Sequence, residues 1–549
     1  MPFVITQRCC NDASCVTECP VDCIRPRPDD PEYGTTEMLY IDPDTCIDCG
    51  ACVDACPVGA IYSDYDLPVS LTRFAELNQA YFQRHPLEST DLAPPRAPER
   101  LPDELGTLRV AIVGSGPAGC YAAVELLQYG NVEVEMFDRL PAPWGLVRSG
   151  VAPDHPETKA VAEMFSSAFR GDAFEFRLDV EVGEHISLAE LRRHHHAVVY
   201  AVGAPGDRRL GIPGEDLPGS HSATEFVAWY NGHPDYTDRE FDLSGERAVI
   251  VGNGNVALDV ARILTLDPDV LAKTDIAYHA LEALRSSNIR EVVVLGRRGP
   301  VQAAYSAPEF LALGYLPSVD VVVDEAELTL DPASRAVLDD PDVEPSLTLK
   351  LDLAHEYAGK PARDGNKRIV FRYLVSPTEL RGSGRVDSVE LVHNTLDADL
   401  NAVPANETEG VKASLVLRAV GYRGEPVADL PFDDARRVIP NSRGRVEGMP
   451  GVYTTGWIKR GPRGVIGTNR ADSQETVATL LEDFRAGMLA EPEFDRSALN
   501  ALLAERRPQS VDKARWRAID AAEKAAGTAV GRPRVKNVAL DVTVPAIGE

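Results

Sequence analysis

The fold of the amino-terminal region is decided by Cys46-Ile-Asp-Cys49-Gly-Ala-Cys52-Val-Asp-Ala-Cys56-Pro57. In the spacing C-x2-C-x2-C-x3-C-P, a looped backbone gathers thiolates around an iron–sulfur cluster, and the fourth cysteine ligates a second cluster. A partner run is therefore required. It lies upstream as Cys9-Cys10-Asn-Asp-Ala-Ser-Cys15-Val-Thr-Glu-Cys19-Pro20-Val-Asp-Cys23. Of the ten cysteines, only Cys120 lies beyond these runs.

The two Cys-Pro pairs divide the cysteines into two ligand sets. We assign one [4Fe-4S] cluster to Cys19, Cys46, Cys49 and Cys52, and a second cluster to Cys9, Cys15 and Cys56. Three ligands favour a [3Fe-4S] cluster, whereas Cys10 or Cys23 would complete a second [4Fe-4S] cluster. Zinc sites are disfavoured because this region has no histidine, and disulfides because no apolar signal region is present.

The amino-terminal region resembles the seven-iron bacterial ferredoxins. It departs from the eight-iron pattern because no C-x2-C-x2-C precedes Cys19. The resemblance implies an α+β ferredoxin fold for residues 1–62.

Composition limits the classes of partner. A length of 549 residues suggests about three to four domains. The net charge of −29 argues against nucleic acid as a partner, and no apolar run approaches the length of a membrane span. Few cysteines outside the runs and no targeting segment predict a cytoplasmic protein.

The chain changes character after the cysteine runs. Residues 63–107 are expected to form a linker that begins with helical periodicity and becomes proline-rich. Such a linker is semi-rigid, so we expect it to keep the cluster module within reach of the rest without fixing it. From residue 108, apolar strands alternate with helices, which predicts a parallel α/β sheet.

A first strand–turn–helix fingerprint follows the linker. Residues 109–119 contain Gly114, Gly116, Pro117 and Gly119 in a G-x-G-x-x-G turn. Such glycines allow a pyrophosphate to approach a helix amino terminus. The next strand ends at Asp138, at the spacing expected for a carboxylate that binds a ribose. We expect Cys120 to be a packing residue.

A second fingerprint contains Gly252, Gly254 and Ala257 in Ala248-Val-Ile-Val-Gly-Asn-Gly-Asn-Val-Ala. A later strand ends at Arg297 and Arg298 instead of a carboxylate. Paired guanidiniums suit the 2′-phosphate of NADP(H). FAD is then the natural occupant of the first site, because a flavin takes a hydride pair from a nicotinamide and releases single electrons to clusters.

Residues 108–470 resemble the adrenodoxin reductase-like ferredoxin–NADP+ reductases of the glutathione-reductase superfamily. The matching stretches span residues 141–159, 201–215, 222–232, 296–305 and 455–468. The whole chain resembles the actinobacterial fusion of a ferredoxin with such a reductase. The resemblance implies an α/β reductase with two Rossmann-like dinucleotide-binding domains.

The resemblance also implies roles for individual residues. It places Asp138, Leu146, Val182, Trp457, Gly464, Val465 and Ile466 at FAD, and Asn255, Val256, Arg297, Arg298 and Glu309 at NADP. His155 and Glu309 would lie beside the nicotinamide as the catalytic pair. The FAD domain would comprise 108–210 and 412–549, its last strand lying at 413–422, and the NADP domain 211–411. The end of the chain, after about residue 485, matches weakly.

Two functions remain open at this point. The first is a ferredoxin–NADP+ reductase that moves electrons between NADPH, FAD and iron–sulfur clusters to a one-electron protein acceptor, such as a cytochrome P450 or another ferredoxin-dependent enzyme. The second is an electron-transfer subunit of a larger oxidoreductase, like the small subunit of glutamate synthase. A disulfide reductase is rejected because no cysteine follows Cys120.

Overall fold

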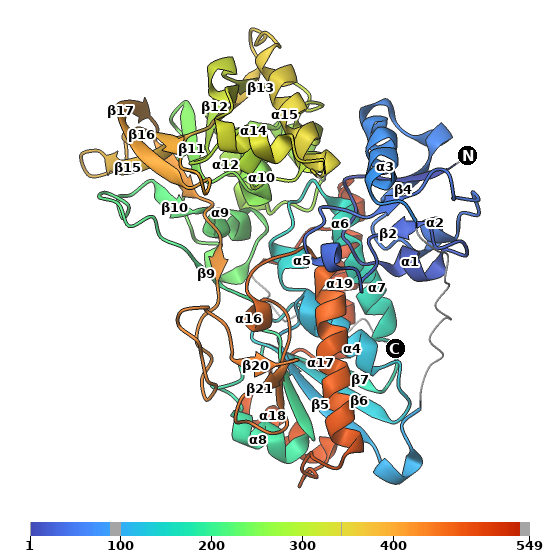
Figure 1. Ribbon diagram of the computed structural model, residues 1–549. Helices are drawn as coiled ribbons and strands as arrows, with labels where there is room; N and C mark the ends of the chain where they lie inside the picture. Colours follow the sequence, from blue (N-terminus) through green and yellow to red (C-terminus); the bar gives the residue numbers. More distant parts are fainter. Residues whose placement is uncertain (1, 88–99, 342, 539–549) are drawn as a thin grey trace.

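Two short antiparallel strand pairs frame the cysteine runs in the computed structural model, which describes residues 2–87, 100–341 and 343–538 (Figure 1). β1 (Phe3–Ile5) pairs with β4 (Ile61–Ser63), and β2 (Ile24–Arg25) pairs with β3 (Tyr40–Ile41). The runs lead into α1 (Ser14–Glu18) and α2 (Ala51–Ala55), which pack against each other. The predicted α+β module is confirmed.

The helix predicted after the module is α3 (Arg73–Arg84), and it belongs to the module instead of a linker. The buried side chain of Asn78 accepts hydrogen bonds from the backbone N–H groups of Ile5 and Ile41. Tyr81 stacks on Tyr40 with ring centroids 4.2 Å apart. These contacts join α3 to both strand pairs, so the expected linker beginning at residue 63 is corrected. The proline-rich part, residues 88–99, lies outside the described residues.

The first large sheet has seven strands in the order β20-β21-β22-β8-β5-β6-β7, and its central strands are parallel. Its strands are β5 (Leu108–Val113), β6 (Val132–Asp138), β7 (Phe174–Leu178), β8 (Ala197–Tyr200), β20 (Asn441–Ser442), β21 (Arg445–Val446) and β22 (Val452–Thr454). Its helices are α4 (Pro117–Leu126), α5 (Leu146–Ser149), α6 (Pro156–Lys159), α7 (Val161–Ala168), α8 (Leu188–His194), α16 (Trp457–Arg460), α17 (Thr468–Arg485), α18 (Arg496–Arg506) and α19 (Lys513–Ala529).

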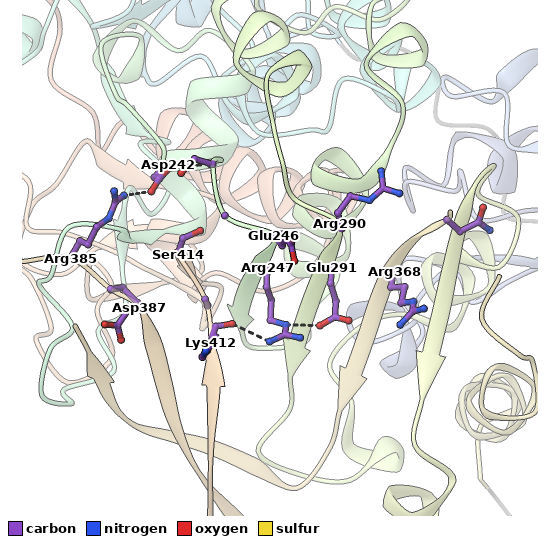
Figure 2. A pocket seen from close by; sticks show the side chains of 15 residues that line it. Asp242, Glu246, Arg247, Arg290, Glu291, Arg368, Arg385, Asp387, Lys412 and Ser414 are labelled. Atoms are coloured by element: carbon purple, nitrogen blue, oxygen red, sulfur yellow. Dashed lines mark hydrogen bonds and ion pairs between the residues drawn. The ribbon is translucent and has the colours of Figure 1, made fainter. Parts of the chain in front are cut away.

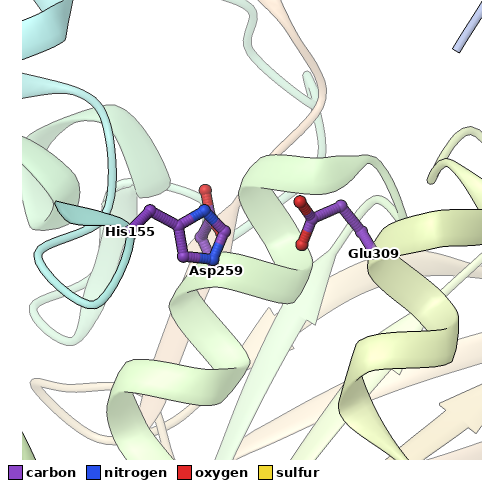
Figure 3. Close-up of side chains that lie close together, drawn as sticks. All are labelled: His155, Asp259 and Glu309. Carbon is purple, nitrogen blue, oxygen red and sulfur yellow. The ribbon is translucent and has the colours of Figure 1, made fainter. Parts of the chain in front are cut away.

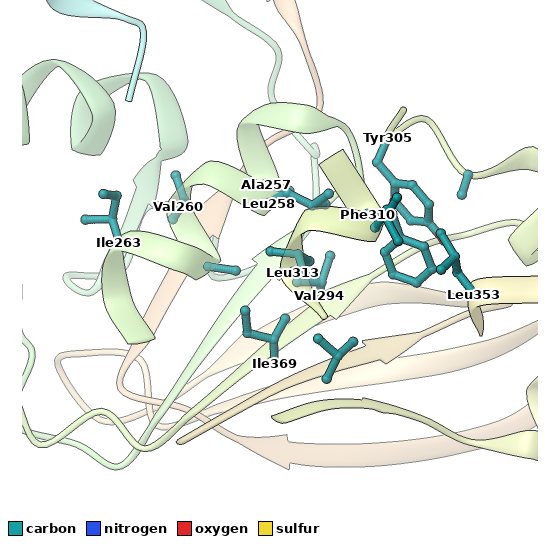
Figure 4. Close-up of a cluster of buried hydrophobic side chains, with 14 of the residues drawn as sticks. Ala257, Leu258, Val260, Ile263, Val294, Tyr305, Phe310, Leu313, Leu353 and Ile369 are labelled. Carbon is teal, nitrogen blue, oxygen red and sulfur yellow. The ribbon is translucent and has the colours of Figure 1, made fainter. Parts of the chain in front are cut away.

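The second large sheet has six parallel strands in the order β10-β18-β11-β12-β14-β13. Its strands are β10 (Ser220–Ser222), β11 (Arg247–Val251), β12 (Glu291–Leu295), β13 (Val319–Val323), β14 (Lys367–Arg372) and β18 (Leu415–Arg418). Its helices are α9 (Ala223–Tyr230), α10 (Asn255–Thr265), α11 (Pro268–Leu271), α12 (Tyr278–Arg285), α13 (Ala307–Leu313), α14 (Pro332–Leu338) and α15 (Pro345–Ala358). Figure 4 shows the apolar core between α10, α13 and this sheet.

The prediction placed one strand in the wrong sheet. We expected residues 413–422 to form the last strand of the FAD domain, but β18 pairs with β10 and β11 of the second sheet. A short buried apolar run carries no signal for which of two parallel sheets it joins. The chain crosses between the two domains at β9 (Gly206–Asp207) and β19 (Tyr422–Arg423), which pair with each other. The two-domain reductase fold itself is confirmed.

A smaller antiparallel sheet extends from the second domain. It contains β15 (Val375–Arg381), β16 (Ser388–Leu396) and β17 (Ala402–Lys412). Between it and the amino-terminal ends of the second sheet lies a hollow of about 730 Å³ (Figure 2). Its charged side chains pair with one another, Arg247 with Glu291 and Arg385 with Asp242.

The cluster module packs against both reductase domains (Figure 1). Arg73 of α3 pairs with Glu356 of α15, and Glu37 pairs with Lys350 of the same helix. Arg8 pairs with Glu157 of the first domain. The expectation of a module held within reach but not fixed is therefore corrected, because the linker composition contained no information about these contacts. None of the described helices is long and apolar enough to span a membrane.

Candidate functional sites

The first predicted cluster site is assembled as expected. Cys19, Cys46, Cys49 and Cys52 line one small hollow, and Asp48 and Gly50 take positive φ angles in the loop between them. Cys23 lines the same hollow, with its sulfur 3.4 Å from that of Cys19. Hydrogen bonding by the Cys23 thiol lowers the pKa of Cys19 and of Cys46 to about 6. This favours the thiolates that bind iron. We call this the outer cysteine site.

The second set, Cys9, Cys15 and Cys56, also lies together. Burial raises the pKa of Cys15, with further contributions from the neighbouring Cys9 and Cys56. The backbone N–H of Leu39 donates to the Cys9 sulfur at 3.4 Å, and that of Ala60 donates to the Cys56 sulfur at 3.3 Å. Such donors stabilise thiolates and fit an iron cluster. We call this the inner cysteine site.

Only one of the two additional candidates is near the inner site. Cys10 is buried, and its pKa is raised by burial and by its neighbours Asp12, Cys9 and Cys56. Cys23 lies at the outer site instead, so its candidacy for the inner cluster is corrected. Sequence spacing could not distinguish them, because Cys23 reaches the outer site by the fold of the loop after Cys19.

Asp12 is a buried residue that the sequence reasoning missed. Its carboxylate accepts a hydrogen bond from the Tyr121 hydroxyl of α4 at 2.6 Å and pairs with Arg470 of α17 at 3.4 Å. The available signal was the spacing Cys9-x2-Asp12-x2-Cys15, in which an aspartate stands where the other run has a cysteine. The carboxylate links the inner cysteine loop to the first reductase domain.

The first fingerprint turn has the geometry that a pyrophosphate requires. A Cβ on Gly114 would lie 2.4 Å from the Ala201 carbonyl oxygen, and one on Gly119 would lie 2.1 Å from the Gly114 carbonyl oxygen. A Cβ on Gly116 would meet no atom within 4 Å, so the space before α4 is open. Pro117 begins the helix. These are the features of an anion site at a helix amino terminus.

The predicted ribose carboxylate lies beside this turn. Asp138 Oδ2 accepts hydrogen bonds from the backbone and hydroxyl of Ser115 at 2.8 and 2.6 Å, and Oδ1 accepts from Leu140. A carboxylate has about four acceptor positions, so one is left for a ribose hydroxyl. The segment before Leu146 closes over the turn, because the Trp144 N–H donates to the Ser115 carbonyl. Val182 packs against the core beside the end of β6.

The carboxy-terminal flavin residues converge on the same helix. α16 begins at Trp457, whose ring centroid lies 5.2 Å from that of Tyr422. A Cβ on the preceding Gly456 would lie 2.5 Å from the Ala118 Cβ, so this segment touches the start of α4. Gly464, Val465 and Ile466 form the loop before α17, which packs along α4. The structure therefore brings Asp138, Gly145 beside Leu146, Gly456 beside Trp457, and Ile466 to the start of α4.

The second fingerprint has similar geometry. A Cβ on Gly252 would lie 2.3 Å from the Ala419 carbonyl oxygen, whereas one on Gly254 would meet nothing within 4 Å. Asn255 begins α10 with Val256 beside it, and the Asn255 side chain accepts a hydrogen bond from Ser306 N–H at 2.8 Å. Cys120, by comparison, is fully buried, as expected of a packing residue.

Arg297 and Arg298 follow the carboxyl end of β12, on the same sheet edge as the second fingerprint. The Arg297 side chain is exposed, and it has no ion-pair partner among residues 2–87, 100–341 and 343–538. Arg298 makes one long hydrogen bond, 3.4 Å, to the Gln302 carbonyl. Both guanidiniums are therefore available to a phosphate.

His155 and Glu309 come together across the domain boundary, with Asp259 between them (Figure 3). Burial raises the pKa of Glu309. Arg262 of α10, which the sequence reasoning missed, donates to His155 Nε2 at 2.7 Å and to Asp259 Oδ1 at 2.7 Å, and lies 3.7 Å from Glu309. A buried guanidinium at this centre disfavours a metal ion there. The spacing of Asn255, Asp259 and Arg262 on one helix face was the available signal.

The inner cysteine loop contacts the end of the 464–466 loop and the start of α17. The Gly467 N–H donates to the Cys10 carbonyl at 2.7 Å, immediately after Ile466. Arg470 donates to the Asp12 carbonyl at 2.9 Å and to the Ser14 hydroxyl at 2.8 Å. Cys10, Val58 and Ala60 share one buried apolar cluster with Ala118 and Tyr121. The inner site therefore lies against the expected flavin position.

The fold and these sites define a two-domain dinucleotide-binding oxidoreductase with an attached iron–sulfur module. Residues 108–294 match the family described as pyridine nucleotide-disulphide oxidoreductase, and residues 39–62 match the 4Fe-4S binding domain. A probable ferredoxin/ferredoxin--NADP reductase of Mycobacterium tuberculosis is 48% identical over 548 residues, covering 98% of this chain and 93% of that protein.

A second relative matches a smaller share of this chain. The NADPH-ferredoxin reductase FprA of Mycobacterium tuberculosis is 48% identical over 448 residues, covering 78% of this chain and 97% of that protein. The solved structure of that FprA in complex with NADPH has a TM-score of 0.75 and covers 79% of this chain and 97% of that one. The chain belongs to the family of ferredoxin/ferredoxin–NADP reductases.

Proposed function

We propose that this enzyme oxidises NADPH at the second domain and delivers the electrons singly, through its own cluster module, to a protein acceptor. The observation that carries the proposal is the contact between the Cys10–Asp12 loop and Gly467 and Arg470. FAD, when bound at the first fingerprint, supplies the conversion of a hydride pair into single electrons. The match over 98% of the chain with a ferredoxin/ferredoxin--NADP reductase favours this over a glutamate synthase-like subunit.

The residues that we assign to the coenzymes act by positioning. Gly252, Gly254, Asn255 and Val256 hold the pyrophosphate of NADP(H) at the start of α10, and Arg297 and Arg298 bind its 2′-phosphate. Gly114, Gly116, Pro117, Gly119 and Asp138 hold FAD, with Leu146, Val182, Trp457 and the 464–466 loop around it. Orientation of the nicotinamide and flavin rings in contact contributes most of the rate, so no acid or base is required for the hydride transfer itself.

His155 and Glu309 complete the nicotinamide site in this proposal. Arg262 donates to His155 Nε2, so the ring accepts at this nitrogen and carries its proton on Nδ1. Arg262 also sits beside Asp259 and Asp154, whose carboxylates balance its charge. The chain thus orients the imidazole at the junction of the two domains, and Glu309 borders the same space.

The cluster types follow from the ligand sets. We assign a [4Fe-4S] cluster to Cys19, Cys46, Cys49 and Cys52, and a [3Fe-4S] cluster to Cys9, Cys15 and Cys56, with Cys10 as the remaining candidate for a fourth iron. The acceptor is a soluble one-electron protein such as a cytochrome P450, and the enzyme works in the cytoplasm.

The Cys49→Ala variant tests this assignment. It should lose the iron of the outer site while keeping one FAD per chain, and it should reduce ferricyanide with NADPH at the parental rate. It should fail to reduce cytochrome c. The matched control is Cys23→Ala, which removes a thiol from the same hollow and should keep the iron count and both activities. Full cytochrome c reduction by a Cys49→Ala protein that lacks the outer cluster would contradict the proposal.

A further inference from the structure

The two cysteine sites differ in what covers them. At the inner site Cys10 and Cys15 are buried, and the Gly467–Arg470 segment covers the Cys10–Asp12 loop. At the outer site Cys49 is exposed. Its neighbours Ile47 and Val53 are 58% and 37% exposed, although apolar side chains of this size usually lie inside.

The exposed residues of the outer site lie close together along the chain. Ile47 and Cys49 lie in the loop before α2, and Val53 lies on that helix. Figure 1 shows α2 at the periphery of the module, away from the second domain. An apolar centre of this kind on a soluble protein marks a surface that another protein covers.

The border of this face is acidic. Glu18, Asp44 and Asp54 are exposed, and they form no ion pair with any of the residues that the structure describes. The bases of residues 2–66 are Arg8, Arg25 and Arg27, and all three are engaged elsewhere, Arg8 with Glu157 and the other two with Asp22. The face therefore presents negative charge around an apolar centre.

From this asymmetry we infer that the external acceptor docks on the outer cysteine site, at a face made of Ile47, Cys49 and Val53 with Glu18, Asp44 and Asp54 at its border. The acceptor is a small protein whose redox centre lies within a basic, partly apolar surface. The reductase covers the inner site and leaves the outer site as the exit. This inference rests on the proposed function and adds the face and the chemistry of the partner.

Cytochrome c, a basic haem protein, serves as the probe for the full-length holoenzyme. A carbodiimide that joins carboxylates to lysines should cross-link it at Glu18, Asp44 and Asp54, as mapped by mass spectrometry of the peptides. Complementary charges steer association and fix register, so Glu18→Gln/Asp44→Asn/Asp54→Asn should weaken binding at low salt by about tenfold or more. An acidic flavodoxin should bind neither the parent enzyme nor the triple variant.

The matched control changes the same number of charges on the second domain. Asp364→Asn/Asp399→Asn/Glu407→Gln alters three exposed acids outside the module and should leave binding unchanged. Equal weakening by both triple variants, or cross-links that map to the reductase domains, would overturn the docking face. If cytochrome c binds at the face but NADPH does not reduce it while ferricyanide is reduced, the proposed function fails and the docking face stands.

Discussion

Replacing Gly467 with alanine should force the module and the reductase apart at their contact. The new Cβ would lie 2.1 to 2.2 Å from backbone atoms of Asn11 and Asp12, whereas ordinary contacts begin at 3.4 Å. The two loops must separate by more than 1 Å, which takes the 2.7 Å hydrogen bond from residue 467 to Cys10 beyond hydrogen-bonding range. Gly467 itself has ordinary negative φ, so alanine adds no backbone strain.

The expected size of the effect combines two terms. Overpacking of a close contact costs about 1–3 kcal/mol, and loss of the backbone hydrogen bond costs about 1 kcal/mol. A total of about 2–4 kcal/mol lowers the docking equilibrium of the module by roughly 30- to 1,000-fold. The module should then spend measurable time detached, while the reductase fold remains intact, because residue 467 lies at the start of α17 and the three atoms nearest to its new Cβ belong to the module's loop.

Two measurements test whether Gly467→Ala detaches the module. Hydrogen exchange of the peptide that contains residue 467 should accelerate, and rapid mixing with NADPH should show flavin reduction at the parental rate followed by slowed cluster reduction. The matched control is Gly34→Ala on the same module, where a Cβ meets no atom within 4 Å. Unchanged exchange together with unchanged cluster reduction would refute the reasoning, because it would show that this contact does not hold the module in place.

Three further outcomes are expected. Arg297→Ala/Arg298→Ala should raise the KM for NADPH far more than that for NADH, since each charge-assisted phosphate contact contributes about 1.5–3 kcal/mol, and equal losses would show that these arginines do not read the 2′-phosphate. The chain should contain seven irons and an oxidised EPR signal, both retained in Cys10→Ser, whereas eight irons and an EPR-silent oxidised state would make Cys10 a ligand. Burial alone would raise the pKa of the Glu523 carboxyl, but Arg148 and the neighbouring groups lower it to about 2. The carboxylate therefore contributes roughly 3 kcal/mol to the free energy of unfolding above about pH 4.5, and this contribution is lost as pH falls towards 2. Urea unfolding of Glu523→Gln and the parent should therefore converge in acid, and a pH-independent difference would contradict this.

The features that were predictable from sequence are those written in local spacing. The cysteine runs and the glycine turns each encode a geometry within about thirty residues, β6 ends at Asp138 as expected, and Arg297 and Arg298 follow β12, which ends earlier, at Leu295. β18 was assigned to the wrong sheet because its buried residues Leu415, Val416 and Leu417 are apolar and carry no local signal for the strands that they pair with.

The features that could not be predicted depend on contacts between distant segments. Arg262 reaches the proposed nicotinamide site through its contact with His155, which comes from the other domain. The end of the chain shows the same limit. Lys536 is buried between Asp275 of the second domain and Asn231, and Arg532 donates to the carbonyl of Thr274. A weakly matching tail therefore ties the two domains together through charges whose partners lie far away in sequence.

The relation between the module and the reductase gives these contacts their meaning. The structure of FprA of Mycobacterium tuberculosis covers 79% of this chain and 97% of its own length. Tyr121 and Arg470 lie on α4 and α17, helices that border the expected FAD site, and their side chains contact Asp12 of the module. A separate cluster protein would lose translational entropy each time it binds the reductase. The covalent link of a fused module removes most of this loss, because the module is always near its docking surface. The same docking covers one cysteine site and leaves Cys49 of the other exposed, so in our proposal a single interface sets both where electrons enter the module and where they leave it.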